Sequence, residues 1–229
     1  MSSGAVLVRC EGISRTYGQG SAATVALQAT DCEVGAGDRI ALVGPSGSGK
    51  STLLHLMAGL DTPTHGRITW PAIGDRDALR PGRVAVIFQG PSLLAPLTVI
   101  ENVALPLVLD GVTDADARRL AAESLELVGL IGLADKLPEE VSGGQSQRIA
   151  VARALAGQPV LVLADEPTGQ LDRPNGAIVV DVLLAAAEHA GAALVVTTHD
   201  PTVAARLPVR WTMRSGDLTT AVAEPSWSR

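Results

Sequence analysis

One stretch of the sequence has the composition of a phosphate-binding loop. It fits the pattern G-x-x-x-x-G-K-[ST]. Glycines let backbone N–H groups come close to an anion, the lysine adds positive charge, and the hydroxyl after it can ligate Mg²⁺. The stretch therefore predicts that this chain binds the phosphates of a nucleotide. The phosphate-binding loop consists of Gly44, Pro45, Ser46, Gly47, Ser48, Gly49, Lys50, Ser51 and Thr52.

The residues on either side of this loop have the pattern that such a loop requires. Arg39 to Val43 is a short apolar run, typical of a buried strand. Ser51 to Gly59 is rich in helix formers and closes on a glycine. A strand, a glycine loop and a helix together aim N–H groups and a helix N-terminus at an anion. These flanks argue against the alternative, a plain turn rich in glycine and serine.

Polar side chains also follow three other apolar runs of the sequence. They are Gln89 after residues 84–88, Asp165 and Glu166 after residues 160–164, and His199 after residues 193–198. Ligands of open α/β sheets bind at the carboxyl ends of the strands. We therefore expect these side chains and the phosphate-binding loop to serve one site.

The adjacent acids Asp165 and Glu166 can do two different jobs, because successive residues of a strand point to opposite sides. One carboxylate can hold Mg²⁺ through its water shell, and the other can orient an attacking water. An acidic loop without a function is the alternative, and the phosphate-binding loop argues against it. For His199 the alternatives are a buried histidine bonded to backbone and, as its position favours, a contact with a γ-phosphate.

The tetrad Ser142-Gly143-Gly144-Gln145 predicts a second helix N-terminus. Ser142 and Gln145 have the spacing of a capping box, so a well-capped helix start is one interpretation. Two glycines in a first turn cost up to roughly 1 kcal/mol each relative to alanine, and a cap alone does not need them. Bare backbone helps when an anion must come close. The tetrad therefore indicates a second phosphate-binding helix start.

Composition narrows the class of protein. Apolar residues make up 46% of the chain, and the net charge is −6 without a basic block, which argues against nucleic acid as the main partner. Cys10 and Cys32 are too few for a disulfide framework or a metal site, and we expect both to be reduced and buried. With no signal peptide and no apolar run of membrane-spanning length, we expect a cytosolic chain.

Strands that alternate with helices predict an α/β fold with a parallel sheet. We expect Ala5 to Cys10 to form an edge strand, Glu11 to Gly20 to be rich in turns, and Thr24 to Val34 to form a second strand. Prolines divide the segment from about Gly90 to Gly157 into short pieces. We expect this segment to be a mostly helical inserted subdomain.

Taken in order, these features resemble the ATP-binding cassette (ABC) of ABC transporters. The order is the phosphate-binding loop, Gln89, Ser142 to Gln145, Asp165, Glu166, Asp172 and His199. The likeness runs from Ile13 to about Leu218, and the signature tetrad is specific to this family. It implies a P-loop NTPase fold with an ABC-type mixed sheet core. It also implies one ABC domain over 1–229, with a β-subdomain at about 5–37 and 66–84, a helical subdomain at about 90–157 and a RecA-like remainder.

The resemblance also implies a role for each site residue, with ATP and Mg²⁺ as ligands. For nucleotide binding, it implies that Tyr17 stacks on adenine and that Gly44 to Thr52 hold the phosphates. ATP held by a second copy is covered by the signature tetrad, Ser142, Gly143, Gly144 and Gln145, together with the D-loop residue Asp172. For the metal, it implies that Ser51 and Asp165 serve Mg²⁺ and that Gln89 senses both Mg²⁺ and the membrane partner. For catalysis, it implies that Lys50 contacts the β and γ oxygens of ATP, that Glu166 is the general base and that His199 is the switch histidine.

Three further stretches narrow the resemblance to the branch for lipoprotein release, macrolide export and cell division. They are residues 59–66, 97–103 and 164–172. The implied protein is a peripheral ATPase on the inner face of the cell membrane, which dimerises with ATP and powers a separate permease. Two alternatives remain open: a soluble ABC ATPase without a permease, such as one for iron–sulfur cluster assembly, and a cell-division ATPase with mechanical output. A regulatory binder without turnover is disfavoured by Glu166 and His199.

Overall fold

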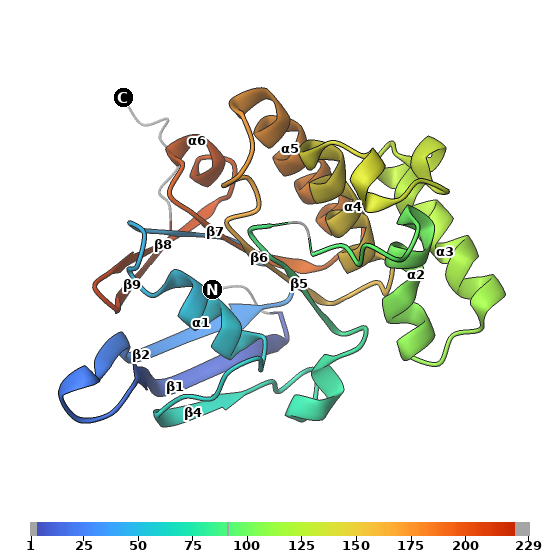
Figure 1. Ribbon diagram of the computed structural model, residues 1–229. Helices are drawn as coiled ribbons and strands as arrows, with labels where there is room; N and C mark the ends of the chain where they lie inside the picture. The colour runs from blue at the N-terminus through green and yellow to red at the C-terminus, as the bar shows by residue number, and fades with distance from the viewer. Residues whose placement is uncertain (1–3, 91, 223–229) are drawn as a thin grey trace. The chain divides into compact units, whose positions relative to one another are not determined.

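The computed structural model describes residues 4–90 and 92–222 (Figure 1). The chain divides into two compact units, one of residues 1–76 and 194–229 and the other of residues 77–193. Within the described residues, no helix combines the length and the apolar character needed to cross a membrane.

The first unit contains an antiparallel sheet with the strand order β2-β1-β4. Its strands are β1 (Val6–Tyr17), β2 (Thr24–Gly35) and β4 (His65–Thr69). The expected strand at Thr24 is confirmed, and so is a strand at Ala5 to Cys10, but its expected edge position is wrong, because β1 lies in the middle of the sheet. The expected turns at Glu11 are also wrong. Register shifts let β1 bend around Gly12 and continue to Tyr17, and Ile13 is fully buried.

The same unit contains a mixed set of strands in the order β7-β3-β8-β9. The strands are β3 (Arg39–Val43), β7 (Ala193–Thr198), β8 (Val209–Arg214) and β9 (Asp217–Val222). β3 pairs in parallel with β7 and β8, and β8 pairs with β9 in antiparallel fashion. The helices of this unit are α1 (Lys50–Met57) and α6 (Pro201–Ala204). As expected for buried parallel strands, β7 has no exposed residue.

The second unit contains a parallel pair of strands and most of the helical residues. The elements are β5 (Val84–Ile87), β6 (Leu161–Asp165), α2 (Val99–Leu109), α3 (Asp114–Leu127), α4 (Gly143–Leu155) and α5 (Arg173–His189). The expectation of a mostly helical segment is confirmed. Helix α2 was not anticipated as a continuous helix, because Pro106 lies inside it. Short 3-10 turns lie at Ile131–Leu133 and Pro138–Glu140 in this unit, at Gly20–Ala22 in the first unit, and at Arg76–Leu79, where the chain passes from the first unit to the second.

The two cysteines lie directly opposite each other in the β1–β2 pair. Both are free and buried, which confirms the expectation for each. The antiparallel sheet, the mixed strand set and the helical segment together confirm the predicted α/β class with a P-loop NTPase core.

Candidate nucleotide-binding site

The phosphate-binding loop leaves the carboxyl end of β3, beside the end of β7. The last register pair of these parallel strands is Val43 with Thr198. Gly44 and His199 are the next residues of the two strands, so they leave the sheet at the same end. His199 is exposed, so the alternative of a buried histidine is wrong. The structure therefore brings His199 and the loop together, as predicted.

The start of α1 differs from the start of every other α-helix in the described residues. Its N-cap, Gly49, has no side-chain cap bond. The other α-helices begin with side-chain caps from Thr98, Thr113, Ser142, Asp172 and Asp200. A helix whose first N–H groups lack a side-chain acceptor presents them, with the positive end of its dipole, to an external anion.

Lys50 places a positive charge over this loop. Its side chain is only 5% exposed. The ammonium Nζ donates to the carbonyl oxygens of Gly44 at 2.9 Å and Pro45 at 3.0 Å. The charge is therefore held beside the N–H groups that face the anion. Ser51, the following residue, is exposed at the same helix start.

Two glycines of the loop are required by packing within the chain, in addition to the access that the sequence pattern predicts for a phosphate. A Cβ on Gly44 would lie 2.2 Å from the Met213 carbonyl oxygen, and one on Gly49 would lie 2.3 Å from that of Ala26. Gly49 also has φ 106°, a left-handed conformation that favours glycine. Gly47 is different, because a Cβ there would have no neighbour within 4 Å among the residues that the structure describes. The sequence pattern indicated phosphate access alone and did not show these backbone neighbours.

Gly49→Ala is expected to destabilise the fold even without nucleotide. Backbone strain of about 1–3 kcal/mol adds to the clash with Ala26, which should lower the melting temperature by about 5 °C or more. Thermal denaturation of the nucleotide-free chain measures the effect. Gly47→Ala is the matched control, with a smaller decrease expected because only its positive φ opposes alanine. Equal melting temperatures for Gly49→Ala and the unmodified chain would contradict the packing argument.

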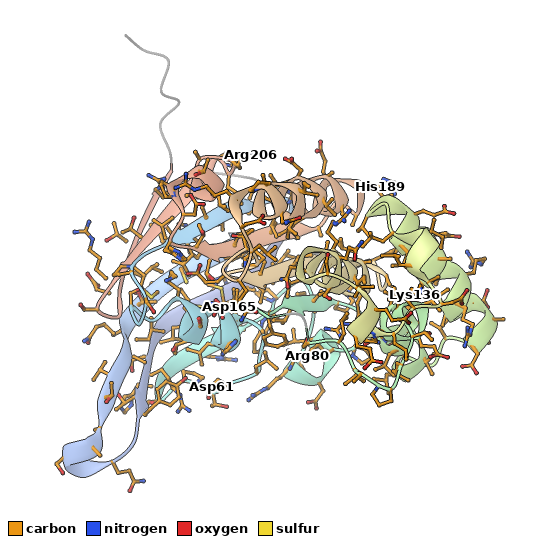
Figure 2. The ribbon with its side chains drawn as sticks, turned by 45° about the horizontal axis from the view of Figure 1, so that its top comes forward. Asp61, Arg80, Lys136, Asp165, His189 and Arg206 are labelled. Carbon is orange, nitrogen blue, oxygen red and sulfur yellow. The ribbon has the colours of Figure 1, made fainter. Side chains whose placement is uncertain are left out.

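In the second unit, Gln89, Asp165 and Glu166 gather at one end of the β5–β6 pair. Ile87 pairs with Ala164 in the last register pair of these parallel strands. Asp165 (labelled in Figure 2) ends β6 and is 8% exposed. A Cβ on Gly169 would lie 3.0 Å from the Gln89 side-chain nitrogen Nε2, so Gln89 lies against the turn that follows Glu166. The predicted grouping of these three residues is therefore present.

Glu166 has a left-handed backbone, with φ 45°. This conformation costs a residue other than glycine roughly 1–2 kcal/mol. The Glu166 carbonyl accepts a hydrogen bond from the Gly169 N–H at 2.9 Å, which closes a tight turn after β6. Such strain collects at functional positions. The turn therefore gives Glu166 a backbone conformation that Asp165, the last residue of β6, does not share.

The start of α4 is a complete capping box. The Gln145 N–H donates to Ser142 Oγ at 3.3 Å, and the Ser142 N–H donates to Gln145 Oε1 at 2.8 Å. The simpler interpretation of the tetrad, a well-capped helix, is therefore correct for these two side chains. It does not account for Gly143, which is exposed and whose added Cβ would come no closer than 3.9 Å to Leu171.

Asp172 serves as the N-cap of α5. Its Oδ1 accepts from the Asn175 N–H at 2.9 Å, and its Oδ2 accepts from Asn175 Nδ2 at 3.1 Å. Asn175 also lies beside Gly144, because a Cβ there would be 3.1 Å from Asn175 Oδ1. The starts of α4 and α5 are thus packed together, and Asp172 is exposed beside the tetrad.

Two residues of α4 that the sequence did not single out bind the segment around Gln89. Gln147 donates through Nε2 to the Phe88 carbonyl at 3.1 Å. Arg153 donates to the Ser92 carbonyl at 2.8 Å and to Ser92 Oγ at 2.6 Å. Burial lowers the pKa of Arg153 from its usual value. The helix that begins with the tetrad therefore holds the chain on both sides of Gln89.

A family model described as "ABC transporter" matches residues 27–169 of this sequence. This chain belongs to the ABC transporter family. The resemblance seen in the sequence is thereby confirmed, and the chain is an ABC ATPase that binds ATP. The match covers the phosphate-binding loop, Gln89, the signature tetrad and both acids.

Two of the similar curated proteins carry one name. The "Lipoprotein-releasing system ATP-binding protein LolD" of Shewanella sp. (strain MR-4) is 42% identical over 226 residues, which cover 96% of this chain and 97% of that protein. The protein of the same name from Legionella pneumophila (strain Paris) is 40% identical and covers 93% of this chain and 97% of its own length.

Solved ABC structures share the fold of this ABC ATPase. The ATP-binding cassette MJ0796, in a dimeric post-hydrolysis state bound to ADP and Pi, has a TM-score of 0.84 and 33% identity, with 96% of this chain and 100% of that chain covered. CbiO1 from Clostridium perfringens, part of an ABC transporter complex, has a TM-score of 0.81 and 26% identity, with 94% of this chain and 87% of that chain covered.

An apolar cavity of about 450 Å³ lies in the second unit of the ABC ATPase. It is bounded by the strand β5, the end of α2, the end of α4 and the segment at Arg80, which Figure 2 labels. Arg153 contributes to its wall, and so does Leu109, which is 71% exposed. Arg153, which donates hydrogen bonds to Ser92, therefore also lines this cavity.

Proposed function

We propose that this chain is the ATP-hydrolysing subunit of an ABC transporter and powers a separate membrane permease of the lipoprotein-release type. One observation supports this mechanism: Gly143, at the start of α4, is exposed, and no contact among the described residues requires a glycine there. The lipoprotein-release type follows from the full-length likeness to proteins named LolD. We further propose that residues 1–229 act as one ABC domain, with the subdomains expected from the sequence.

The active form in this proposal is a dimer of two identical chains. Each phosphate-binding loop holds ATP that is closed over by the Ser142–Gln145 tetrad of the other chain. Bare Gly143 lets the start of α4 come close to the γ-phosphate, and exposed Asp172 lies beside that contact. The dimeric state of the similar cassette MJ0796 supports this arrangement.

Hydrolysis in this proposal depends on positioning and charge. Tyr17 stacks on adenine, the N–H groups of the loop and Lys50 bind the phosphates, and Glu166 orients a water for attack on the γ-phosphorus. His199, beside the loop, stabilises charge on the γ-phosphoryl oxygens. The strained backbone of Glu166, which Asp165 does not share, supports separate roles for the two acids.

The donors at the site fit a magnesium ion that arrives with the nucleotide. Among the described residues, no group of three or more His, Cys, Asp or Glu side chains is arranged to hold a metal. Mg²⁺ on a nucleotide needs few protein ligands, because phosphate oxygens and water supply the rest. We propose that Ser51 binds it and, as the family resemblance implies, that Asp165 and Gln89 also serve it. When bound, the ion neutralises charge on the β and γ oxygens.

The permease in this proposal docks at the apolar cavity of the second unit. The cavity wall contains Arg153, which holds the segment after Gln89, and Arg153 lies on the helix that starts with the tetrad. A shift of α4 on ATP closure would therefore displace the Gln89 segment at the cavity edge. This places the chain on the inner face of the membrane, attached through the permease.

Co-purification of the tagged chain from detergent-solubilised membranes of its own cells tests this function. We expect recovery of an integral membrane permease with spanning helices and an ATPase activity that the permease alters. Recovery of soluble partners only would favour the soluble ABC ATPase, and recovery with a permease that controls a cell-wall hydrolase would favour the cell-division alternative. Leu109→Arg is the matched variant, and loss of the permease is expected because a charge would enter the apolar wall.

A further inference from the structure

Three side chains at the end of β1 and in the loop after α1 form one bonded cluster. Tyr17 donates its hydroxyl to Asp61 Oδ2 at 2.8 Å. Arg15 donates through Nε to the same oxygen at 2.9 Å, and its Nη2 lies 2.8 Å from Asp61 Oδ1. Both oxygens of Asp61, which Figure 2 labels, are therefore bonded, and the forked Arg15 contact fixes the carboxylate plane.

The guanidinium of Arg15 also covers one face of the Tyr17 ring. Its central carbon lies 4.5 Å from the ring centroid, within the range of a cation–π contact. Tyr17 is nevertheless 41% exposed. With one face against Arg15 and the hydroxyl tied to Asp61, the opposite face is the one that a flat base can reach. The ring is thus held in one orientation before any ligand arrives.

The carboxylate of Asp61 is itself held in place. Burial raises the pKa of Asp61, but hydrogen bonds from the Thr62 N–H, Tyr17 and Arg15 outweigh it, so the pKa lies below its usual value. The Thr62 N–H donates to Asp61 Oδ1 at 2.7 Å. Arg76 braces the same loop by donating to the carbonyl oxygens of Gly59 at 2.9 Å and Asp61 at 3.3 Å.

This loop also joins the Tyr17 ring to the phosphate-binding helix. The N–H groups of Leu60 and Asp61 donate to the His55 carbonyl, in the last turn of α1, at 2.9 Å and 3.3 Å. On the other side, the Thr16 N–H donates to Thr64 Oγ1 at 3.0 Å. The helix that begins at the phosphates therefore ends in the loop that fixes the ring. Hydrogen bonds therefore link the phosphate-binding helix, through this loop, to the strand that carries Tyr17.

We propose that Arg15 and Asp61 are positioning residues that preorganise Tyr17 as the platform for adenine. The inference rests on the proposed function, in which Tyr17 stacks on the base. Neither residue touches the reacting atoms, so their contribution is to the affinity for ATP and not to the hydrolytic step. A fixed ring loses less conformational entropy on binding than a free one.

Steady-state ATPase kinetics of Asp61→Asn and Arg15→Gln test this inference. We expect the KM for ATP to rise about 3- to 10-fold with kcat within about twofold, because preorganisation alone is lost. Inhibition by inorganic tripolyphosphate, which has no base, should be unchanged. Arg15→Lys retains the charge beside Asp61 but loses the flat stack, and it should fall between Arg15→Gln and the unmodified chain. Arg9→Gln, which breaks another ion pair on β1, is the matched control and should change neither constant.

Tyr17→Ala separates failure of this inference from failure of the proposed function. If Tyr17→Ala raises the KM for ATP and Asp61→Asn does not, the positioning role is overturned and Tyr17 remains the platform. If Tyr17→Ala leaves the KM unchanged, the role of Tyr17 fails and this inference fails with it. If Asp61→Asn weakens inhibition by tripolyphosphate as much as it raises the KM for ATP, the role of Asp61 is purely structural. That result also overturns the inference.

Discussion

Glu166→Gln is expected to lower the rate of ATP hydrolysis at least about 100-fold while ATP binding persists, because a positioned general base contributes about 10²- to 10⁴-fold. Glutamine keeps the size of the side chain but cannot take a proton from water. ATP should then hold two chains together, because hydrolysis, the step that lets the dimer separate, is blocked. Phosphate release measures the first effect, and size-exclusion chromatography with ATP and Mg²⁺ measures the second.

Glu188→Gln is the matched control for this prediction. Glu188 is an exposed acid on α5 in the same unit, far along the chain from the β6 turn. We expect it to hydrolyse ATP at the unmodified rate and to show no persistent dimer. Turnover at the unmodified rate in Glu166→Gln would transfer the role of base to another group.

The strands that carry the site could be predicted because buried parallel strands are short, continuous apolar runs. β7 has the expected bounds, Ala193–Thr198, and β5 and β6 lie within one residue of them. Each run ends in a polar residue at the carboxyl end of its strand, where ligands bind. The positions of Gln89, Asp165 and His199 therefore followed from local sequence alone.

Other features depended on contacts between distant segments, which a local pattern does not contain. β1 was expected to end early because the segment from Glu11 to Gly20 is rich in turn residues. In the fold, β2 pairs with β1 from Val6 to Tyr17, and β4 pairs with it from Arg9 to Ser14. Helix α2 was missed because of Pro106, although Thr98 and Glu101 form a capping box that could have revealed its start.

The residues that connect the parts of each site were also beyond prediction. In the sequence, Asp61 was noted only within the stretch 59–66, and its contact with Tyr17 spans 44 positions. Arg153 was not singled out in the sequence, and its partner Ser92 lies 61 positions away. Single side chains of this kind have no periodicity, so only the folded chain shows what they bind.

Gly143→Asp is expected to abolish ATP hydrolysis without destabilising the isolated chain. Within the chain, a side chain at 143 has room, because a Cβ would be 3.9 Å from Leu171 Cδ2. An acid in the first turn of a helix is favourable for its dipole, so the melting temperature should be equal or higher. A carboxylate against a phosphate costs several kcal/mol, which corresponds to a loss on the order of 100-fold or more in activity.

Gly132→Asp is the control, since Gly132 is exposed and a Cβ there would have no described atom within 4 Å. It should keep full activity. The two Asp variants place the same charge in the same unit, and only Gly143 lies at a helix start proposed to meet ATP. Full activity in Gly143→Asp would leave the tetrad as a helix cap alone.

Mixing Gly143→Asp with Lys50→Ala decides whether the site is shared between two chains. Each variant alone spoils both sites of a symmetric dimer. In a mixed dimer, one site combines two damaged parts, while the other combines an intact phosphate-binding loop with an intact tetrad. Half of randomly paired dimers are mixed, so activity should return to about a quarter of the unmodified value if the sites act independently. A site confined to one chain gives no recovery, because every chain in the mixture carries a defect. The phosphate-binding loop and the signature helix are therefore halves of one site only if two inactive proteins become active together.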